Sequence, residues 1–264
     1  MNKPKSLIYR YAFTVIFLLG IVAQQAFARQ TEYTKYVDPF VGNADNGHTF
    51  PGACRPFGMI QTSPVTGGIG WRYCSEYVYS DSIIWGFTQD HLNGTGCMDL
   101  GDILVMPSTG KRTRSWDEYR SHFYKTQEFA TPGYYSVYLT DTKVKAELTA
   151  SAHVAFHRYT YDSTDSTSVL IDLQHGPAWN YKQYHSQVNR CETHWEDAYT
   201  LVGHVQNTVW VKQDYFFIIK FNRPVASHIT LNKAADTEKG DRIVATFDGI
   251  DQGEQLLMKI SMST

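Results

Sequence analysis

The chain has 264 residues, of which 42% are hydrophobic and 19% are charged, and this apolar content excludes intrinsic disorder. Twenty-four basic residues against 26 acidic ones give a formal net charge of -2, which excludes the strongly basic surface of a general nucleic-acid binder. The mean hydropathy of -0.36 argues against a polytopic membrane protein.

Residues 1–28 have the pattern of a secretory signal peptide. A basic start precedes an apolar run at 11–23, and Ala26-Phe27-Ala28 supplies a small-x-small cleavage sequence. The alternative is a membrane anchor, but the apolar run is short for a bilayer span of ~20 residues. We therefore expect an exported protein (periplasmic, outer-surface or extracellular) with a mature chain of 29–264. Its formal charge falls from -2 to -5, because the removed segment holds three basic residues and no acidic one.

The mature chain holds all four cysteines, which are Cys54, Cys74, Cys97 and Cys191. They form no C-x-x-C pair, so a zinc ribbon and a thioredoxin motif are excluded. Export would allow a disulfide, but cysteine is also often a small buried thiol. The sequence leaves the pairing open.

The body of the chain reads as a series of strands. Apolar and polar residues alternate at 133–140 and 143–150, which indicates half-buried antiparallel strands. Further strands are expected at 153–161, 168–173, 199–206, 208–213, 215–221, 225–231, 242–247 and 255–262. The nearest approach to a helical period, at 116–129, is too polar and mixed to predict a helix. Many short strands without a fixed repeat predict one all-β domain, a large antiparallel sandwich or barrel.

Two patterns resemble metal sites. His153 and His157 are four residues apart, but in a strand this spacing is ~13 Å, too far for one metal ion. We expect them to be framework residues. Residues 43–47 resemble a calcium loop only faintly and lack its closing Glu, so a plain turn is expected.

Residues 36–110 combine many glycines with large rings, which is typical of ordered ligand-binding loops. The rings suited to stacking on the C–H face of a sugar are Phe50, Phe57 and Trp71. The side chains suited to bonding sugar hydroxyls are His48, Asp90, His91 and Asp102. Taken singly, each ring is more often a core residue and each glycine more often a turn.

The motifs of this region, in this order, make the chain resemble the N-terminal domain of glycoside hydrolase family 92. They are Tyr36-Val-Asp-Pro-Phe-Val-Gly42, His48-Thr-Phe-Pro-Gly52, Pro56-Phe-Gly-Met59, Gly70-Trp71, Gly86-Phe87, His91-Leu92, Gly94-Thr-Gly96 and Asp99-Leu-Gly-Asp-Ile103. The resemblance continues through Pro132-Gly-Tyr-Tyr135, Ala146-Glu-Leu-Thr149 and His157-Arg-Tyr159, and so covers nearly the whole mature chain.

The resemblance implies a secreted, exo-acting, calcium-dependent α-mannosidase (α-1,2-mannosidase type) that inverts configuration and acts on mannose-terminated glycans such as N-glycans. It implies a galactose-mutarotase-like β-sandwich at 29–264, with the active site between this domain and a C-terminal (α/α)6 helical domain. In this family the helical domain supplies both catalytic carboxylates and the calcium ligands. Residues 255–264 have the pattern of a strand that continues to the last residues of the sequence. We therefore expect the helical domain to be absent from this chain and encoded further along the same gene or in an adjacent one.

The same resemblance assigns substrate-binding residues but no catalytic residue and no metal ligand. Trp71 is expected to contact the sugar. The residues expected to shape the pocket are Phe50, Pro51 and Gly52. Cys74 and His91 are expected to match family positions beside it. Three positions depart from the family: Arg72 stands where Asp is usual, Gln89 where His is usual and Asp90 where Thr is usual. These departures put the linkage specificity in doubt.

Three functions remain open at this point. The first is one wall of the terminal mannose subsite, inactive without its partner domain. The second is a stand-alone carbohydrate-binding protein without hydrolytic activity. The third is a non-catalytic protein that associates through an apolar face left uncovered. No nucleic-acid partner and no membrane span after signal cleavage are expected.

Overall fold

The computed structural model describes residues 33–67, 70–110, 116–163, 165–176, 187–208, 210–231 and 240–264. The chain divides into two units, Met1–Val37 and Asp38–Thr264. The described part of the first unit contains the 3₁₀ turn η1 (Tyr33–Tyr36). The expected signal peptide at 1–28 lies outside the described residues.

The second unit contains a seven-stranded sheet in which all neighbouring strands run antiparallel. In spatial order its strands are β1 (Ala53–Cys54), β2 (Gln61–Val65), β4 (Gly86–Thr88), β5 (Leu104–Thr109), β11 (Thr167–Asp172), β16 (Arg242–Phe247) and β15 (Ser227–Thr230). Every residue of β5 and β11 is buried, so both faces of the middle of this sheet are covered.

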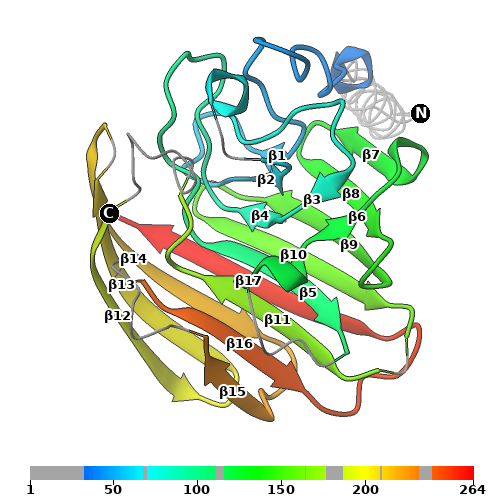
Figure 1. Cartoon of the computed structure of the whole chain (residues 1–264), viewed down its shortest axis with the longest axis vertical. Helices are drawn as coiled ribbons and strands as arrows, with labels where there is room; N and C mark the ends of the chain where they lie inside the picture. The colour runs from blue at the N-terminus through cyan, green and yellow to red at the C-terminus, as the bar shows by residue number, and fades with distance from the viewer. Residues whose placement is uncertain are drawn as a thin grey trace, which may run out of the picture. The chain divides into compact units, whose positions relative to one another are not determined.

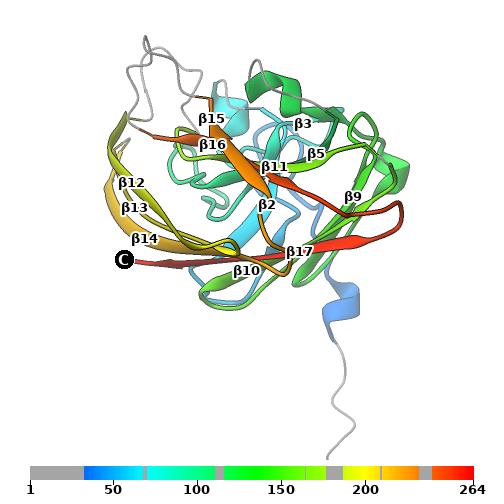
Figure 2. The same ribbon diagram turned by 90° about the horizontal axis from the view of Figure 1, so that it is seen from below.

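An eight-stranded antiparallel sheet forms the second layer (Figures 1 and 2). In spatial order its strands are β12 (Gln187–Asp197), β13 (Thr200–Thr208), β14 (Lys212–Phe221), β17 (Gln255–Ser263), β10 (Val154–Tyr161), β9 (Val144–Ala150), β8 (Tyr134–Leu139) and β7 (Glu128–Thr131). The smaller elements are the β3 (Ile83–Ile84) and β6 (Ser121–His122) pair and the 3₁₀ turns η2 (Trp71–Tyr73), η3 (Trp116–Tyr119) and η4 (Lys125–Gln127).

The two large sheets bury a common core. Strands β1, β2 and β5 contact β9 of the other sheet, and one cluster of buried apolar side chains draws on both. Along β10, β14 and β17 buried residues alternate with more exposed ones, because one face of the sheet packs on the core and the other faces outward. The expected all-β sandwich is confirmed.

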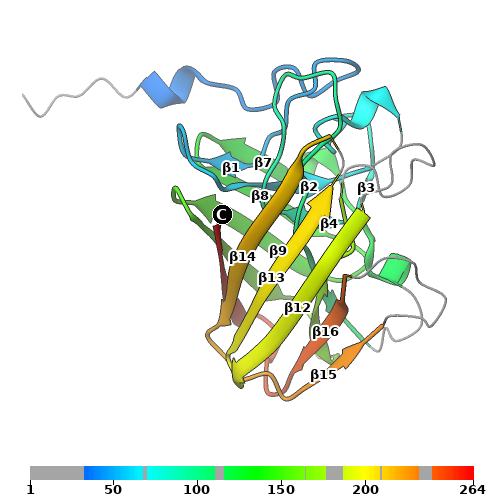
Figure 3. The ribbon, with the colours of Figure 1, turned by 90° about the vertical axis from the view of Figure 1, so that its left-hand side faces the viewer.

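Most of the expected strands are present, but β2, β4, β5 and β7 were not predicted, and two further corrections apply. The separate strands expected at 208–213 and 215–221 are wrong: β13 runs to Thr208, and β14 is one strand from Lys212 to Phe221. The strand β12 was missed, because it is an edge strand (Figure 3) and carries a mainly polar sequence without clear alternation. The segment 116–129 forms short 3₁₀ turns and short strands rather than a helix.

Of the two histidines expected to be framework residues, His157 takes that role, whereas His153 is exposed just before β10. His157 is fully buried on β10, and burial lowers its pKa to about 3. Its ring bonds Tyr159 Oη at 2.8 Å, Gln89 Oε1 at 3.1 Å and Thr62 Oγ1 at 3.3 Å. His157 therefore links the two sheets through neutral hydrogen bonds.

A buried ion pair attaches η4 to the sandwich. The Lys125 ammonium donates to Glu128 at 2.9 Å and to Tyr77 Oη at 2.7 Å. It also lies 4.4–4.9 Å from the ring centroids of Phe123, Tyr77 and Tyr79. The side chain of Glu128 is only 1% exposed, so Lys125 supplies the charge that compensates this carboxylate.

Replacing Lys125 by Met keeps the apolar stem and removes the charge. We expect Lys125→Met to lower the free energy of unfolding by about 3 kcal/mol, because the Glu128 carboxylate stays buried without its cation. Urea denaturation measures the change. Arg190→Met is the matched control: its pair with Glu192 is largely exposed, so a loss below about 1 kcal/mol is expected. Equal losses in the two variants would contradict this account.

Candidate functional site

Three segments that are distant in sequence meet beside the sandwich: residues 48–52, 70–76 and 91–96, here called the loop cluster. The backbone amide of Gly94 donates to the carbonyl of His48 at 2.6 Å. The hydroxyl of Ser75 donates to the carbonyl of Thr49 at 3.0 Å. These bonds join the three segments without regular secondary structure between them.

Trp71 is the exposed ring of the loop cluster. It opens η2 and is 59% exposed, while its ring packs edge-on against His48 with 5.1 Å between centroids. Gly96 lies directly against the ring: a Cβ added there would stand 2.1 Å from Trp71 Cη2. Two neighbours thus fix the indole while leaving much of it open to solvent, which suits stacking on a sugar.

The expected pocket-shaping residues lie beneath this surface. Phe50 is 6% exposed and its ring lies 4.9 Å from that of His91. Pro51 is buried, and a Cβ on Gly52 would stand 2.2 Å from the carbonyl oxygen of Thr62, so only glycine allows this approach to β2. The structure gives these residues a supporting position. Phe57, the third candidate ring, stands fully exposed on the turn between β1 and β2, apart from the loop cluster.

Cys74 also lies below the surface. It is 2% exposed, and burial together with the nearby Cys97 raises the pKa of its thiol to about 11. It is therefore a protonated, unreactive thiol at neutral pH. All four cysteines lie in the described part of the chain and are free thiols there.

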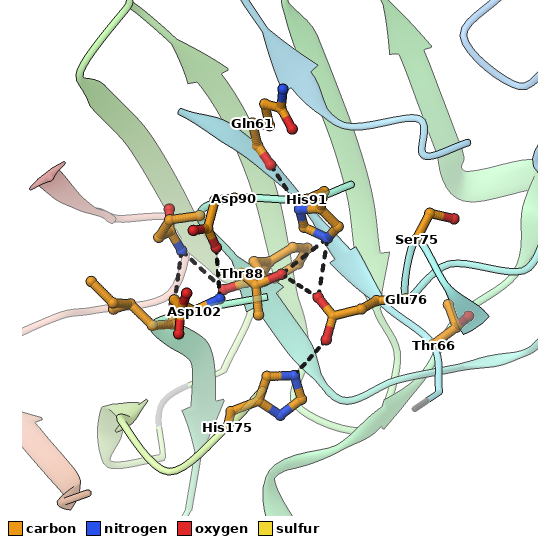
Figure 4. Close-up of polar contacts among 12 residues, drawn as sticks. Gln61, Thr66, Ser75, Glu76, Thr88, Asp90, His91, Asp102 and His175 are labelled. Carbon is orange, nitrogen blue, oxygen red and sulfur yellow. Dashed lines mark hydrogen bonds and ion pairs between the residues drawn. The ribbon is translucent and has the colours of Figure 1, made fainter. Parts of the chain in front are cut away.

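A network of polar side chains lies under the loop cluster (Figure 4). His91 is 3% exposed and bonds the carbonyl of Gln61 through Nδ1 at 2.8 Å. Its Nε2 lies 3.0 Å from Thr88 Oγ1 and 3.3 Å from Glu76 Oε2. The other oxygen of Glu76 bonds His175 Nε2 at 2.8 Å. His91 is therefore held from both sides, and its ring lies against that of Phe50.

Two buried carboxyl groups adjoin this network. Asp90 Oδ1 accepts the backbone amide of Asp102 at 2.7 Å, and Asp102 Oδ1 accepts hydrogen bonds from Asn207 Nδ2 and, at 3.2 Å, from Tyr215 Oη. Burial raises the pKa of Asp90 to about 6. Burial and the neighbouring Asp90 raise the pKa of Asp102 well above its ordinary value. The pair consequently retains protons that exposed carboxyl groups lose.

The three departures from the family pattern have different positions. Gln89 is fully buried and donates to the carbonyls of Phe87 and Ile103, and Asp90 belongs to the carboxyl pair. Arg72 alone is on the surface, where it donates to Ser80 Oγ at 2.7 Å and lies 3.8 Å from Asp45. Of the three, only Arg72 is placed to meet a ligand beside Trp71.

A cavity of about 510 Å³ lies beside the loop cluster. Its lining includes Asp90, Leu92, Asp99, Tyr215 and Met262, but not Trp71 or Phe50. The cavity thus does not include the two rings that the sequence proposed for the sugar pocket.

Neither a metal centre nor a membrane helix is found in the part of the chain that the structure describes. These residues hold no group of three or more His, Cys, Asp or Glu side chains that could bind a metal ion. The carboxylates of the network are buried and already paired, so they do not fit the six to eight oxygen ligands of calcium. In the same residues no helix is long and apolar enough to cross a membrane.

The sequence of residues 36–263 matches the family model of the glycosyl hydrolase family 92 N-terminal domain. The chain belongs to this family. The match spans nearly the whole second unit, so the loop cluster and both sheets fall within it.

Solved structures of family 92 proteins have the same fold. An α-mannosidase from Bacteroides thetaiotaomicron, solved in complex with mannoimidazole, is 29% identical and superposes with a TM-score of 0.75. The match covers 88% of this chain and 32% of that one. Another family 92 glycosyl hydrolase is 25% identical with a TM-score of 0.73, over 88% of this chain and 32% of its own.

A curated relative from the fungus Arthroderma benhamiae is described as an uncharacterized secreted glycosidase. It is 27% identical over 172 residues, which are 60% of this chain and 22% of the relative. This family 92 chain therefore spans about a third of the solved relatives and about a fifth of the curated one.

The sequence named the segments of the loop cluster but not the groups that connect them. Glu76 and His175 were missed, because they lie 99 positions apart and no spacing rule predicts their contact. Glu76 also has a backbone φ of +62°, a left-handed conformation that the sequence would have assigned to a glycine. Asp90 and Asp102 were named as hydroxyl-binding candidates, but the structure buries both.

The contact between Gly96 and Trp71 can be tested by a small substitution. We expect Gly96→Ala to displace the indole, because the new methyl group overlaps Cη2, while the exposed position keeps the loss of stability below about 1 kcal/mol. The measurement is the shift in tryptophan emission relative to wild type, with Trp71→Phe marking the contribution of this ring. An unchanged emission spectrum would contradict the packing described above.

The carboxyl pair predicts a specific pH dependence. Both folded pKa values are raised above that of an unfolded aspartate, near 4. The folded pair therefore holds protons that the unfolded chain has lost. Its contribution to stability is complete below pH ~4 and declines as the pH rises through about 6.

We expect Asp102→Asn to flatten this decline, because the neutral amide reproduces the shape of the protonated acid. At pH 7.5 the variant should be more stable than wild type by about 2 kcal/mol. Thermal unfolding followed from pH 4 to pH 8 measures the effect, and Asp248→Asn, at an exposed carboxyl group, should retain the decline. Parallel profiles for wild type and Asp102→Asn would contradict the raised pKa values of the carboxyl pair.

Proposed function

We propose that this chain is the N-terminal domain of an exported exo-α-mannosidase of the α-1,2 type and forms one wall of its terminal mannose subsite. The observation that carries the proposal is the exposed indole of Trp71, held by His48 and Gly96 at the surface of the loop cluster. Membership of family 92 and the mannoimidazole complex of a relative support mannose as the sugar. The proposed partner is a mannose-terminated glycan.

In this proposal Trp71 stacks on the apolar face of the terminal mannose. The indole buries C–H groups of the ring and orients its hydroxyls, while the buried Phe50 and His91 keep the adjoining loop in place. Cys74, Pro51 and Gly52 support the same wall from beneath. This surface binds and positions the sugar and excludes water from one side of it.

The catalytic groups are proposed to come from the remaining two thirds of the family enzyme. Inversion requires a carboxylic acid and a carboxylate base about 6.5–9.5 Å apart on opposite faces of the sugar. The carboxyl groups beneath the described loop cluster do not meet this requirement, because Glu76, Asp90 and Asp102 are buried and bonded to protein. The calcium of the family enzyme is assigned to the same remaining region, where it would orient the sugar and stabilise developing charge.

The proposal is tested with 4-nitrophenyl α-D-mannopyranoside in the presence of calcium. We expect no turnover by the chain alone. Turnover should appear when a family 92 C-terminal region is added, and Trp71→Ala should reduce it about tenfold or more, since the lost stacking is worth about 1.5 kcal/mol. Phe216→Ala is the matched control, because that ring is similarly exposed, at 57%, but lies on β14.

Two outcomes would point elsewhere. Robust hydrolysis by the chain alone would contradict the assignment of the catalytic groups to another region. Saturable binding of methyl α-D-mannopyranoside by the chain alone, without any gain in turnover from the added region, would favour a stand-alone carbohydrate-binding protein.

A further inference from the structure

The backbone at Glu76 is strained at the point where the Trp71 segment ends. Its φ of +62° is a conformation that side-chain-bearing residues rarely adopt and that costs about 1 kcal/mol or more. The amide of Glu76 donates to the carbonyl of Tyr73 at 2.9 Å, and its carbonyl accepts the amide of Thr66 at 2.8 Å. This conformation turns the Glu76 side chain under the loop cluster.

The carboxylate of Glu76 joins segments that are distant in the sequence. One oxygen accepts from His175 Nε2, just beyond β11, at 2.8 Å. The other accepts from Thr88 Oγ1 at 2.8 Å and lies 3.3 Å from His91 Nε2. Figure 4 shows Glu76 between the two rings. Gly101 closes over the group so tightly that a Cβ there would stand 2.7 Å from the carboxylate atoms.

The carboxylate keeps its charge in this setting. Burial by itself raises the pKa of Glu76, but His175, His91 and the hydroxyl of Thr88 together hold it below its ordinary value. Burial lowers the pKa of His91, and the negative charge of Glu76 opposes that change. At neutral pH an anionic Glu76 is therefore buried between two imidazoles.

We propose that Glu76 is the positioning residue of the mannose wall: its buried carboxylate holds His91, and its strained backbone sets the direction of the segment that carries Trp71. The inference rests on the proposed function for the identity of the ligand, but not for the positioning itself. The ring of His91 contacts that of Phe50, so the position of Phe50 depends on that of His91. Residues 72–75 connect Glu76 to Trp71, so the backbone direction at Glu76 affects the position of the indole.

Two substitutions separate the carboxylate from the backbone strain. Glu76→Gly suits the left-handed conformation, so it is expected to fold. It removes the carboxylate, so His91 and His175 each lose their contact with residue 76. Glu76→Gln keeps the shape and an acceptor for His175 but removes the charge. Lys143→Gly is the matched control, since Lys143 is exposed, has a φ of +53° and lies between β8 and β9.

The first readout is the imidazole nitrogen NMR spectrum of the full chain, with signals assigned by His91→Asn and His175→Asn. Glu76→Gly should shift and broaden both signals, Glu76→Gln should shift them without broadening, and Lys143→Gly should leave them unchanged. The second readout is the dissociation constant for methyl α-D-mannopyranoside, measured with the family C-terminal region present. Glu76→Gly should weaken binding about tenfold or more and Glu76→Gln about threefold, because a displaced wall loses its alignment with the sugar.

The outcomes keep the two proposals apart. Wild-type imidazole signals in a folded Glu76→Gly variant would overturn the positioning role, whatever the dissociation constant for the mannoside is. If Glu76→Gly does not fold, Glu76→Gln decides: unchanged His91 and His175 signals in that variant overturn the inference. A wild-type protein that binds no mannoside refutes the proposed function, while the NMR result still decides the role of Glu76.

Discussion

The buried carboxylate of Glu76 is the interaction on which the arrangement of the loop cluster depends. Loops without regular pairing need other partners for their polar groups, and one anion here accepts hydrogen bonds from Thr88 and His175 and lies beside His91. Such a network is stable only when every member is satisfied, because an unpaired buried charge costs several kcal/mol. The strained backbone at Glu76 is maintained by these surrounding bonds.

The sandwich supplies the rigid frame from which the loops extend. Its core is filled by buried side chains from both sheets, including the rings of Tyr159, Tyr161 and Phe217. Part of the abundance of aromatic residues therefore reflects packing between the sheets, as β-propensity predicts. Trp71 differs from these rings because loops, rather than strands, place it at the surface.

Burial also limits the chemistry that the carboxyl groups of this domain can perform. Burial raises the pKa of Asp90 and Asp102, while Glu76 keeps its charge beside two imidazoles, and all three carboxyl groups are bonded to protein. In the proposed enzyme, this domain contributes shape and apolar contact to the sugar and leaves acid–base chemistry to the other region.

The sequence by itself determined the fold class, because alternation at positions such as 144–150 and 154–161 reflects a local rule that holds strand by strand. Its motifs also named the segments that form the loop cluster, since the glycine- and aromatic-rich stretches are continuous in the chain. The contacts between those segments were decided only by the tertiary structure. Glu76 meets His175 across 99 positions, and Asp90 and Asp102 become a proton-holding pair only when folding removes them from water. Desolvation and long-range contact leave no periodic signature in a sequence, so neither was predictable from it.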